Sequence, residues 1–156
     1  MDHRWLKEDN KTVAIDKRGK WWKGSSFADL DEYIRAYTEE GYPAQIIRQS
    51  ICACGATAFQ LEADRDEGCA RRICSSCGQA AFLGDSSDCW EEAEPERCSC
   101  PCRNRSFEIG VGFSLRSDGE VKWITVGERC LKCGVLGSFV DWKIDYSPTH
   151  HLLEQV

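Results

Sequence analysis

The sequence predicts a small α+β protein in which an N-terminal ββα unit precedes two β-rich modules. Three features support this fold class: apolar residues recur at helical spacing between residues 27 and 39, strict alternation begins at residue 107, and two consecutive segments each carry two close pairs of cysteines. The second module is long enough for a three-stranded antiparallel sheet. The expected boundaries are 1–47 for the ββα unit, 48–84 for the first module, 85–97 for an acidic connector, 98–147 for the second module and 148–156 for a C-terminal tail.

The N-terminal unit is predicted to be a hairpin followed by a helix. Residues 12–15 form the first strand, the DKRG turn ends on the favoured glycine, and residues 20–23 form the return strand. Ser26 is the expected N-cap of the helix, and Asp29 follows three residues later, as in a capping box. A glycine and a proline just beyond residue 39 end the helix. We expect the apolar stripe of the helix to pack on the hairpin.

The cysteines are the strongest signal of chemistry in the chain. Each of two segments begins with a C-x-C pair and, after a loop, carries a C-x-x-C pair followed by glycine. A tetrahedral zinc site needs four ligands, and each short spacing lets two thiolates converge while the loop returns the second pair to close the shell. We therefore predict two structural zinc ions, one bound by Cys52, Cys54, Cys74 and Cys77 and the other by Cys100, Cys102, Cys130 and Cys133.

The two segments also match outside the cysteines, as copies of one module would. Phe59 and Phe107 each lie seven residues after the first cysteine of their segment, and Gly78 and Gly134 follow the closing cysteines. These halves resemble zinc ribbons, in which two knuckles on β-hairpins hold one zinc ion, over residues 48–146. The CSSCG and CLKCG knuckles are close to the ribbon pattern, whereas CAC and CPC are tighter than its usual C-x-x-C. Zinc can supply folding free energy that a short chain lacks, on the order of 10 kcal/mol per structural site.

Three cysteines remain outside this scheme, and one of them competes with it. Cys98 precedes Cys100 by two residues, so three thiols are available for two coordination positions. The register of the repeat favours Cys100 and Cys102, and Cys98 in place of either is the alternative. Cys69 and Cys89 are expected to be ordinary buried or surface thiols. The odd cysteine count, the C-x-x-C knuckles and the absence of a hydrophobic signal sequence disfavour a disulfide framework and favour a reducing cytoplasm.

The second module has the clearest strand periodicity. Residues 107–115 alternate apolar side chains with glycine, serine and charged residues, which predicts a strand with one buried face. After a turn at residues 117–119, we expect a second strand at 121–126 and, beyond the knuckle, a third at 140–146.

The two faces of that sheet are expected to differ. Trp123 and Trp142 should lie on the apolar face and form part of the core. The glycines on the opposite face of the first strand, Gly110 and Gly112, indicate either a bulge or the close approach of another backbone.

The charge of the chain favours a basic protein partner over a nucleic acid. The formal net charge is −6 with neutral thiols. Because eight ligand thiolates add −8 and two Zn²⁺ ions add +4, the net charge of the folded, zinc-bound protein is about −10. Such a chain is poorly suited to binding a phosphate backbone, whereas it can steer a basic protein toward itself. The candidate contact residues lie in the acidic connector: Trp90, Glu91, Glu92 and Glu94. A solvated linker is the ordinary interpretation of such an acidic run, and for Trp90 itself packing against a module is favoured over docking to a partner.

The sequence contains no recognisable catalytic constellation. A catalytic zinc keeps an open position and usually has histidine among its ligands, but the histidines are His3, His150 and His151, near the ends of the chain. No H-E-x-x-H motif, deaminase-type H-x-E motif or phosphate-binding glycine loop is present. Because no apolar run approaches about 20 residues, we expect no transmembrane helix. We therefore expect a protein that is not an enzyme.

Two binding functions remain. In the first, the protein is a protein-binding factor that masks a basic partner, as an inhibitor or an immunity protein does. It is similar in size, charge and lack of catalytic residues to the small acidic immunity proteins that neutralise nuclease-like toxins. In the alternative, it is a nucleic-acid-binding zinc ribbon whose cations flank two aromatic rings: Lys17, Arg18, Lys20, Trp21, Trp22 and Lys23. Alternation places the two tryptophans on opposite faces, so one should pack and one should be free. The protein partner is the favoured expectation.

Overall fold

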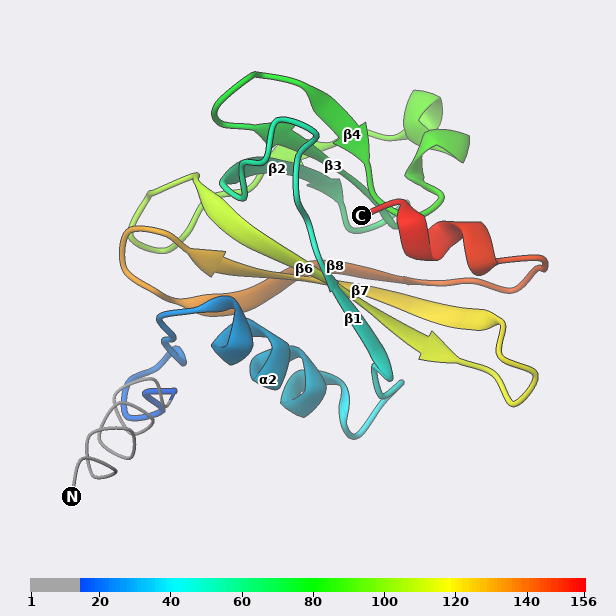
Figure 1. Ribbon diagram of the computed structural model, residues 1–156, viewed down its shortest axis with the longest axis horizontal. Coiled ribbons are helices and arrows are strands. Elements are labelled where there is room, and N and C mark those ends of the chain that lie inside the picture. Colours follow the sequence, from blue (N-terminus) through cyan, green and yellow to red (C-terminus); the bar gives the residue numbers. More distant parts are fainter. Residues whose placement is uncertain (1–14) are drawn as a thin grey trace.

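A computed structural model of the protein describes residues 15–156 and confirms the α+β class (Figure 1). Within these residues, one α-helix precedes eight strands and three short 3₁₀ turns. The elements are α2 (Phe27–Thr38), β1 (Ile46–Gln49), β2 (Phe59–Asp64), β3 (Cys69–Cys74), β4 (Ala80–Phe82), η1 (Ser86–Asp88), η2 (Trp90–Glu92), β5 (Glu96–Arg97), β6 (Phe107–Leu115), β7 (Val121–Cys130), β8 (Leu136–Lys143) and η3 (His150–Glu154).

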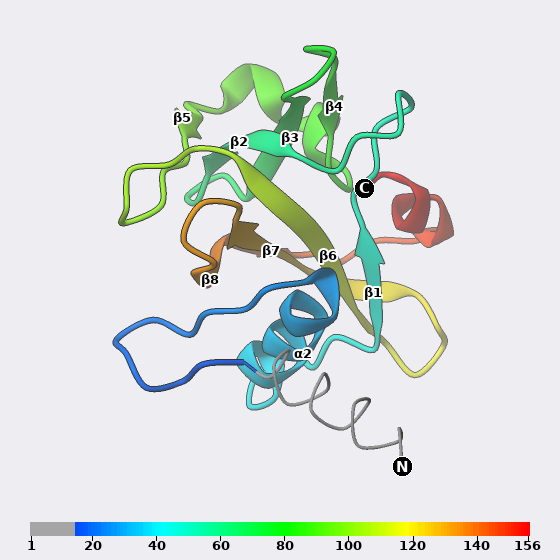
Figure 2. The same cartoon turned by 60° about the vertical axis from the view of Figure 1, so that its left-hand side comes forward.

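The described strands all belong to one antiparallel sheet. Its main order is β4-β3-β2-β6-β7-β8, with β1 paired to β6 and β5 paired to β2. The two cysteine-bearing segments are joined by the pairing of β2 with β6, at Phe59 and Phe107. Beyond this junction β3 contacts β8, so the two parts of the sheet face each other. Figures 1 and 2 show β2, β3 and β4 on one side of β6–β8 and α2 on the other.

Helix α2 begins and ends close to its predicted limits. The hydroxyl of Ser26 accepts a hydrogen bond from the amide of Asp29 at 3.4 Å, as expected of the N-cap. The Asp29 carboxylate accepts the amide of Ser25 at 2.8 Å, one residue before the position that a capping box uses. At the other end, the hydroxyl of Thr38 accepts the amide of Ala44 at 3.0 Å and so holds the turn that leads into β1.

The buried stripe of α2 packs on the sheet, with Trp22 of the N-terminal hairpin at its edge. This packing corrects the prediction that β6 has one buried face, because residues on both faces of β6 are buried. Glycines make room for the helix: a Cβ on Gly112 would lie 2.9 Å from Ile34 Cγ2, and one on Gly127 would lie 2.6 Å from Ile34 Cγ1. Gly110 and Gly112 therefore mark the approach of helix side chains, and not of another backbone.

The larger hydrophobic core lies on the other face, between the two parts of the sheet. Trp142 is buried there as predicted, and a Cβ on Gly68, whose φ is +76°, would lie 2.6 Å from Trp142 Cβ. Trp123 was expected on the same face, but the register between β6 and β7 shifts next to Ser114. Trp123 is thereby turned to the helix side, where it stacks on Tyr42 with 4.3 Å between ring centroids. Other fully buried members of this core are Phe59, Leu61, Phe107, Ile109, Phe113 and Ile124.

The expected connector is folded onto the sheet and is not a free linker. It contains the turns η1 and η2, and its end forms β5, which pairs with β2. Asp85 anchors its beginning, because the indole of Trp142 and the hydroxyl of Tyr146 donate to the two carboxylate oxygens at 2.9 and 2.7 Å. The backbone path of the acidic segment is therefore set by the fold.

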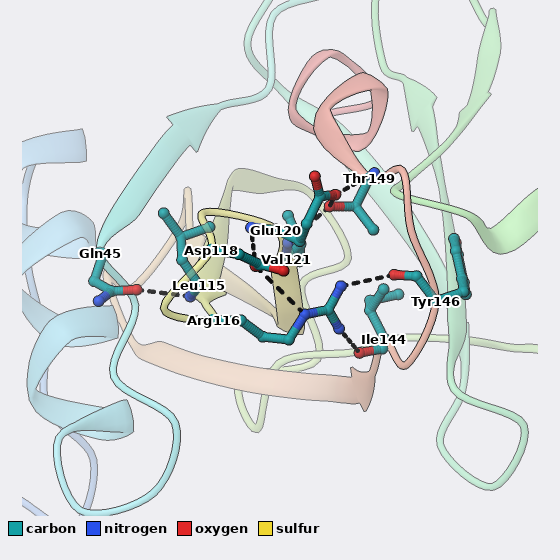
Figure 3. Close-up of polar contacts among 9 residues, drawn as sticks. All are labelled: Gln45, Leu115, Arg116, Asp118, Glu120, Val121, Ile144, Tyr146 and Thr149. Atoms are coloured by element: carbon teal, nitrogen blue, oxygen red, sulfur yellow. Dashed lines mark hydrogen bonds and ion pairs between the residues drawn. The ribbon is translucent and has the colours of Figure 1, made fainter.

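The expected C-terminal tail is also attached to the sheet (Figure 3). Glu120 accepts hydrogen bonds from the amide and the hydroxyl of Thr149, at 2.7 and 2.6 Å. Arg116 donates to the carbonyl oxygens of Ile144 and Tyr146 at 3.3 and 2.8 Å. The strands before this tail are displaced from their predicted bounds, since β7 extends to Cys130 and β8 ends at Lys143.

The N-terminal hairpin is described only in part. Most of the strand predicted at residues 12–15 lies outside the described residues. Asp16 pairs with Lys23 across the turn, and the amide of Leu136 donates to the Trp22 carbonyl at 2.8 Å, which attaches the hairpin to the start of β8. Over residues 15–156, the structure has no helix with the length and apolar composition needed to span a bilayer.

Candidate metal centres and an acidic hollow

The structure assembles both predicted cysteine sets into compact groups. In each group the four sulfur atoms lie within 4.8 Å of one another. The shortest separations are 3.6 Å for Cys52–Cys77 and Cys54–Cys74, 3.5 Å for Cys100–Cys133 and 3.6 Å for Cys102–Cys130. A tetrahedron of sulfur atoms around zinc at about 2.3 Å has edges of about 3.8 Å. The two groups therefore fit one Zn²⁺ ion each, with all four positions taken by protein thiolates.

Amide donors stabilise the thiolate of Cys74 in the first group and that of Cys130 in the second. The amides of Cys77 and Ser76 donate to Cys74 Sγ at 3.5 and 3.3 Å and lower the pKa of Cys74 to about 6. Burial raises the pKa of Cys130, but the amide of Cys133 and the side-chain amide of Asn104 outweigh it and bring that pKa to about 6. Because zinc binds the thiolate form, these donors favour metal binding, whereas burial raises the pKa of Cys100 in the second group and opposes it.

The two short C-x-C knuckles have the same backbone path. The amide of Cys52 donates to the carbonyl of Ala56 at 2.9 Å, and that of Cys100 donates to Asn104 at 2.8 Å. Each knuckle then needs a residue in the left-handed region. The first copy has Gly55 with φ +92°, whereas the second has Arg103 with φ +77°, a conformation that costs a non-glycine residue about 1–2 kcal/mol.

The closing knuckles match as well. Gly78 and Gly134 have φ of +79° and +82°, and their amides donate to the carbonyls of Cys74 and Cys130 at 2.9 Å. The repeat also explains the junction of the sheet, because Phe59 and Phe107 occupy equivalent positions and pair with each other.

The remaining cysteines lie outside both groups. Cys98 is buried in the hydrophobic core and its amide donates to the Leu61 carbonyl at 2.8 Å, so its side chain packs and does not replace Cys100 or Cys102 in the four-sulfur group. Cys69 is fully buried, and Cys89 is half-buried with its sulfur 3.8 Å from the Ser86 carbonyl.

A hollow of about 670 Å³ separates the connector from β8. Its charged lining consists of five carboxylates and two guanidinium groups: Asp64, Asp66, Glu92, Glu94, Glu96, Arg65 and Arg97. Asp64 organises it, since its carboxylate accepts the amides of Glu94, Asp66 and Glu67 at 2.8, 2.9 and 3.1 Å. These donors, that of Glu94 first, hold the pKa of Asp64 below its ordinary value.

The candidate contact residues of the connector divide into two groups. Glu92 and Glu94 line the hollow, and both are exposed. Trp90 packs instead against the first module: its ring centroid lies 5.3 Å from that of Phe82, and the Arg71 guanidinium lies over it at 5.1 Å. Glu91 is exposed but does not line the hollow. The carboxylates contributed by the β2–β3 turn were not recognised in the sequence, because nothing local indicates that this turn meets the connector.

The basic hairpin presents most of its charge to solvent. Lys17, Arg18, Lys20 and Lys23 are exposed, and Arg18 pairs with Asp16 at 3.0 Å. Its tryptophans behave as expected from the alternation. Trp22 packs edge-on against Tyr33 with a centroid separation of 5.8 Å, whereas Trp21 is 45% exposed.

Comparison with known proteins gives no relative: no family model matches the chain, and neither does any curated protein or solved structure. Any function assigned to the chain therefore depends on the geometry described above.

Proposed function

We propose that the protein is a non-enzymatic, zinc-stabilised binding factor that masks a basic segment of a protein partner in a reducing cytoplasm, in the manner of an inhibitor or immunity protein. The acidic hollow is the observation that carries this proposal. It gathers five carboxylates from two separate segments, against two guanidinium groups. Such a concentration of one sign of charge attracts a basic partner and raises its rate of association.

The backbone segments that carry the carboxylates of the hollow are held in place before any partner arrives. Asp64 ties the connector to the β2–β3 turn through the Glu94 amide, and β5 pairs with β2 directly beyond it. One of the two guanidinium groups is already occupied, because Arg97 donates to Glu62 at 3.4 Å. A preformed surface loses little conformational entropy on binding, which favours affinity for a complementary partner.

The second metal centre lies next to the wall of the hollow in the sequence. Cys98 and Ser99 line the hollow and are followed directly by the ligands Cys100 and Cys102. Zinc at this centre would fix the wall of the hollow, in addition to stabilising a chain that has one modest core on each face of its sheet. We therefore assign zinc a structural role and place the binding function on the acidic surface.

The first experiment is affinity purification of the tagged full-length protein from its native host, with and without nuclease treatment. We expect one stoichiometric protein, basic at the contact surface, that remains after nuclease digestion. Recovery of nucleic acid alone, lost when Lys17, Arg18, Lys20 and Lys23 are replaced by glutamine, would instead establish the nucleic-acid alternative.

The second experiment tests the surface. A triple variant, Asp66→Asn with Glu92→Gln and Glu94→Gln, removes three exposed carboxylates of the hollow. Its association with the captured partner at 0.15 M salt should be slower by about tenfold or more, and the difference should shrink at high salt because exposed charges are then screened. The matched control neutralises three exposed carboxylates elsewhere, at Glu39, Glu40 and Glu154. Equal effects of the two triple variants would place the partner outside the hollow.

A further inference from the structure

A second pocket, of about 390 Å³, lies where the N-terminal hairpin and α2 meet the second metal module. Aromatic rings make up much of its wall: Trp21, Tyr33, Tyr37, Phe107 and Phe139. Trp21 and Tyr37 are among the most exposed large apolar side chains of the described chain, at 45% and 51%. Rings that a small protein leaves open around a pocket are available to a ligand.

A buried carboxyl group, that of Glu128, completes this pocket. Glu128 is only 3% exposed, yet its Oε1 atom has no hydrogen-bond partner in the described structure. Gly137 lies opposite it across the ladder and leaves it room, since a Cβ on Gly137 would lie 3.1 Å from Glu128 Oε2. A buried acceptor without a donor is unfavourable unless something supplies the donor. A donor group that enters the pocket can supply this hydrogen bond.

A break in the strand pairing connects this pocket to the acidic hollow. The register of β7 with β8 shifts between Val126 and Gly127, so that Phe139 has no partner across the ladder. Such a bulge redirects a side chain, and the Phe139 ring meets Phe107 edge-on with 5.7 Å between centroids. Phe139 and Ser99 line both the aromatic pocket and the acidic hollow. The two cavities are therefore neighbours, close enough for adjacent residues of one segment to reach both.

We propose that this pocket receives one lysine side chain of the basic partner, while neighbouring basic residues of the same segment occupy the acidic hollow. The inference rests on the proposed function and specifies the contact. Aromatic faces attract an ammonium group, and the apolar walls suit the alkyl stem of lysine. Glu128 Oε1 accepts one ammonium N–H. Arginine would bring five donors in a rigid fork, more than this sparsely polar pocket can satisfy.

The protein's own Lys20 shows that the Trp21 ring can attract an ammonium group, and its positive charge should also weaken the binding of an incoming lysine. Its ammonium group lies 5.1 Å from the centroid of the Trp21 ring, so this ring already attracts a cation. An incoming lysine would meet a like charge there. Replacing Lys20 by glutamine should therefore strengthen the binding of a lysine ligand, a result that a purely apolar pocket would not give.

The test titrates the full-length, zinc-loaded protein with Nα-acetyl-lysine methylamide, followed by NMR at the Trp21 indole N–H and the Phe139 amide. The corresponding norleucine and arginine derivatives, and the nucleoside guanosine, serve as comparison ligands. We expect saturable chemical-shift changes with the lysine compound and weaker binding of the arginine compound. The norleucine compound and guanosine should not bind. Glu128→Gln should weaken the binding of the lysine compound by about tenfold or more, because an amide cannot become the carboxylate that would pair with an ammonium group. Glu39→Gln, on the exposed end of α2, is the matched control.

Three results with the ligands would overturn the inference. Equal binding of norleucine would show an apolar pocket only, stronger binding of guanosine would show a nucleobase site, and no shift with lysine would show no site. The Glu128→Gln variant must still carry two zinc ions, which separates a lost contact from a lost fold. If the lysine compound fails while the acidic triple variant still loses the captured partner, this inference fails and the proposed function stands. If the lysine compound binds but affinity purification captures no protein partner, the proposed function fails.

Discussion

The substitution Gly127→Ala tests the packing of α2 on the sheet. An ideal Cβ at this position would lie 2.6 Å from Ile34 Cγ1, 2.7 Å from Ile34 Cδ1 and 3.4 Å from Leu30 Cδ1. Ile34 is fully buried, so it cannot move aside into solvent. The added methyl group must therefore shift the helix or force an unfavourable rotamer.

The expected cost follows from two opposing terms. Overpacking a filled core typically costs about 1–3 kcal/mol, and alanine recovers about 0.4–1 kcal/mol because it restricts the unfolded chain more than glycine does. A net loss of about 1–2 kcal/mol should lower the Tm by about 2–8 °C for a chain of this size. Ile34→Val removes the Cδ1 atom, so the double variant should be more stable than the sum of the two single changes indicates.

Thermal unfolding by circular dichroism in excess zinc measures these differences. Gly41→Ala is the matched control, since nothing lies within 4 Å of a Cβ at that position. The control should change the free energy of unfolding by less than about 0.5 kcal/mol. If Gly127→Ala were as stable as Gly41→Ala, or if Ile34→Val gave no coupling, the helix would not pack on this face as described.

Three further predictions concern the second metal centre. Arg103→Gly should raise the free energy of unfolding by about 0.5–1 kcal/mol, because relief of the left-handed conformation exceeds the added entropy of the unfolded chain; a lower Tm would contradict this. Asn104→Ala should weaken zinc binding by about tenfold to a hundredfold in a chelator competition, since its amide donates to Cys130 Sγ at 3.2 Å. Cys133→Ser should release one zinc ion and lower the Tm far more than Cys98→Ser, and equal losses would show that Cys98 is a ligand.

Much of the local structure could be predicted because short-range chemistry determines it. The cysteine pairs could be assigned from spacing alone, and the register of the repeat distinguished Cys100 and Cys102 from Cys98. Ser26 located the start of α2, and the alternation from residue 107 located β6 at its observed limits, Phe107–Leu115. In each case the deciding residues lie within a few positions of the feature.

The long-range arrangement could not be obtained in this way. Pairing of Phe59 with Phe107 joins residues that are far apart in the chain, and no local pattern specifies it. The helix side of the sheet was mistaken for an exposed face because glycines, which make room for Ile34, carry no hydrophobic signal of their own. A register shift moved Trp123 to that side, and a bulge at Phe139 shaped the pocket around Glu128.

The proposed binding site could not be found in the sequence for a related reason. The acidic hollow draws carboxylates from the β2–β3 turn and from the connector, and Asp64 joins them through the Glu94 amide. The sequence identified the connector because its acids are clustered within residues 85–96, but it gave no reason to associate Asp66 with it. Charge patterns show which segments are acidic, and only the fold shows which of them face each other.

Native mass spectrometry of the full-length protein tests the central claim most directly, because the proposed surface depends on two closed Cys₄ zinc centres. We expect two zinc ions per chain, and one in each of the variants Cys77→Ser and Cys133→Ser, since each removes a ligand from a different group. A wild-type protein that carries one zinc ion or none, after purification in zinc-containing buffer, would contradict the account.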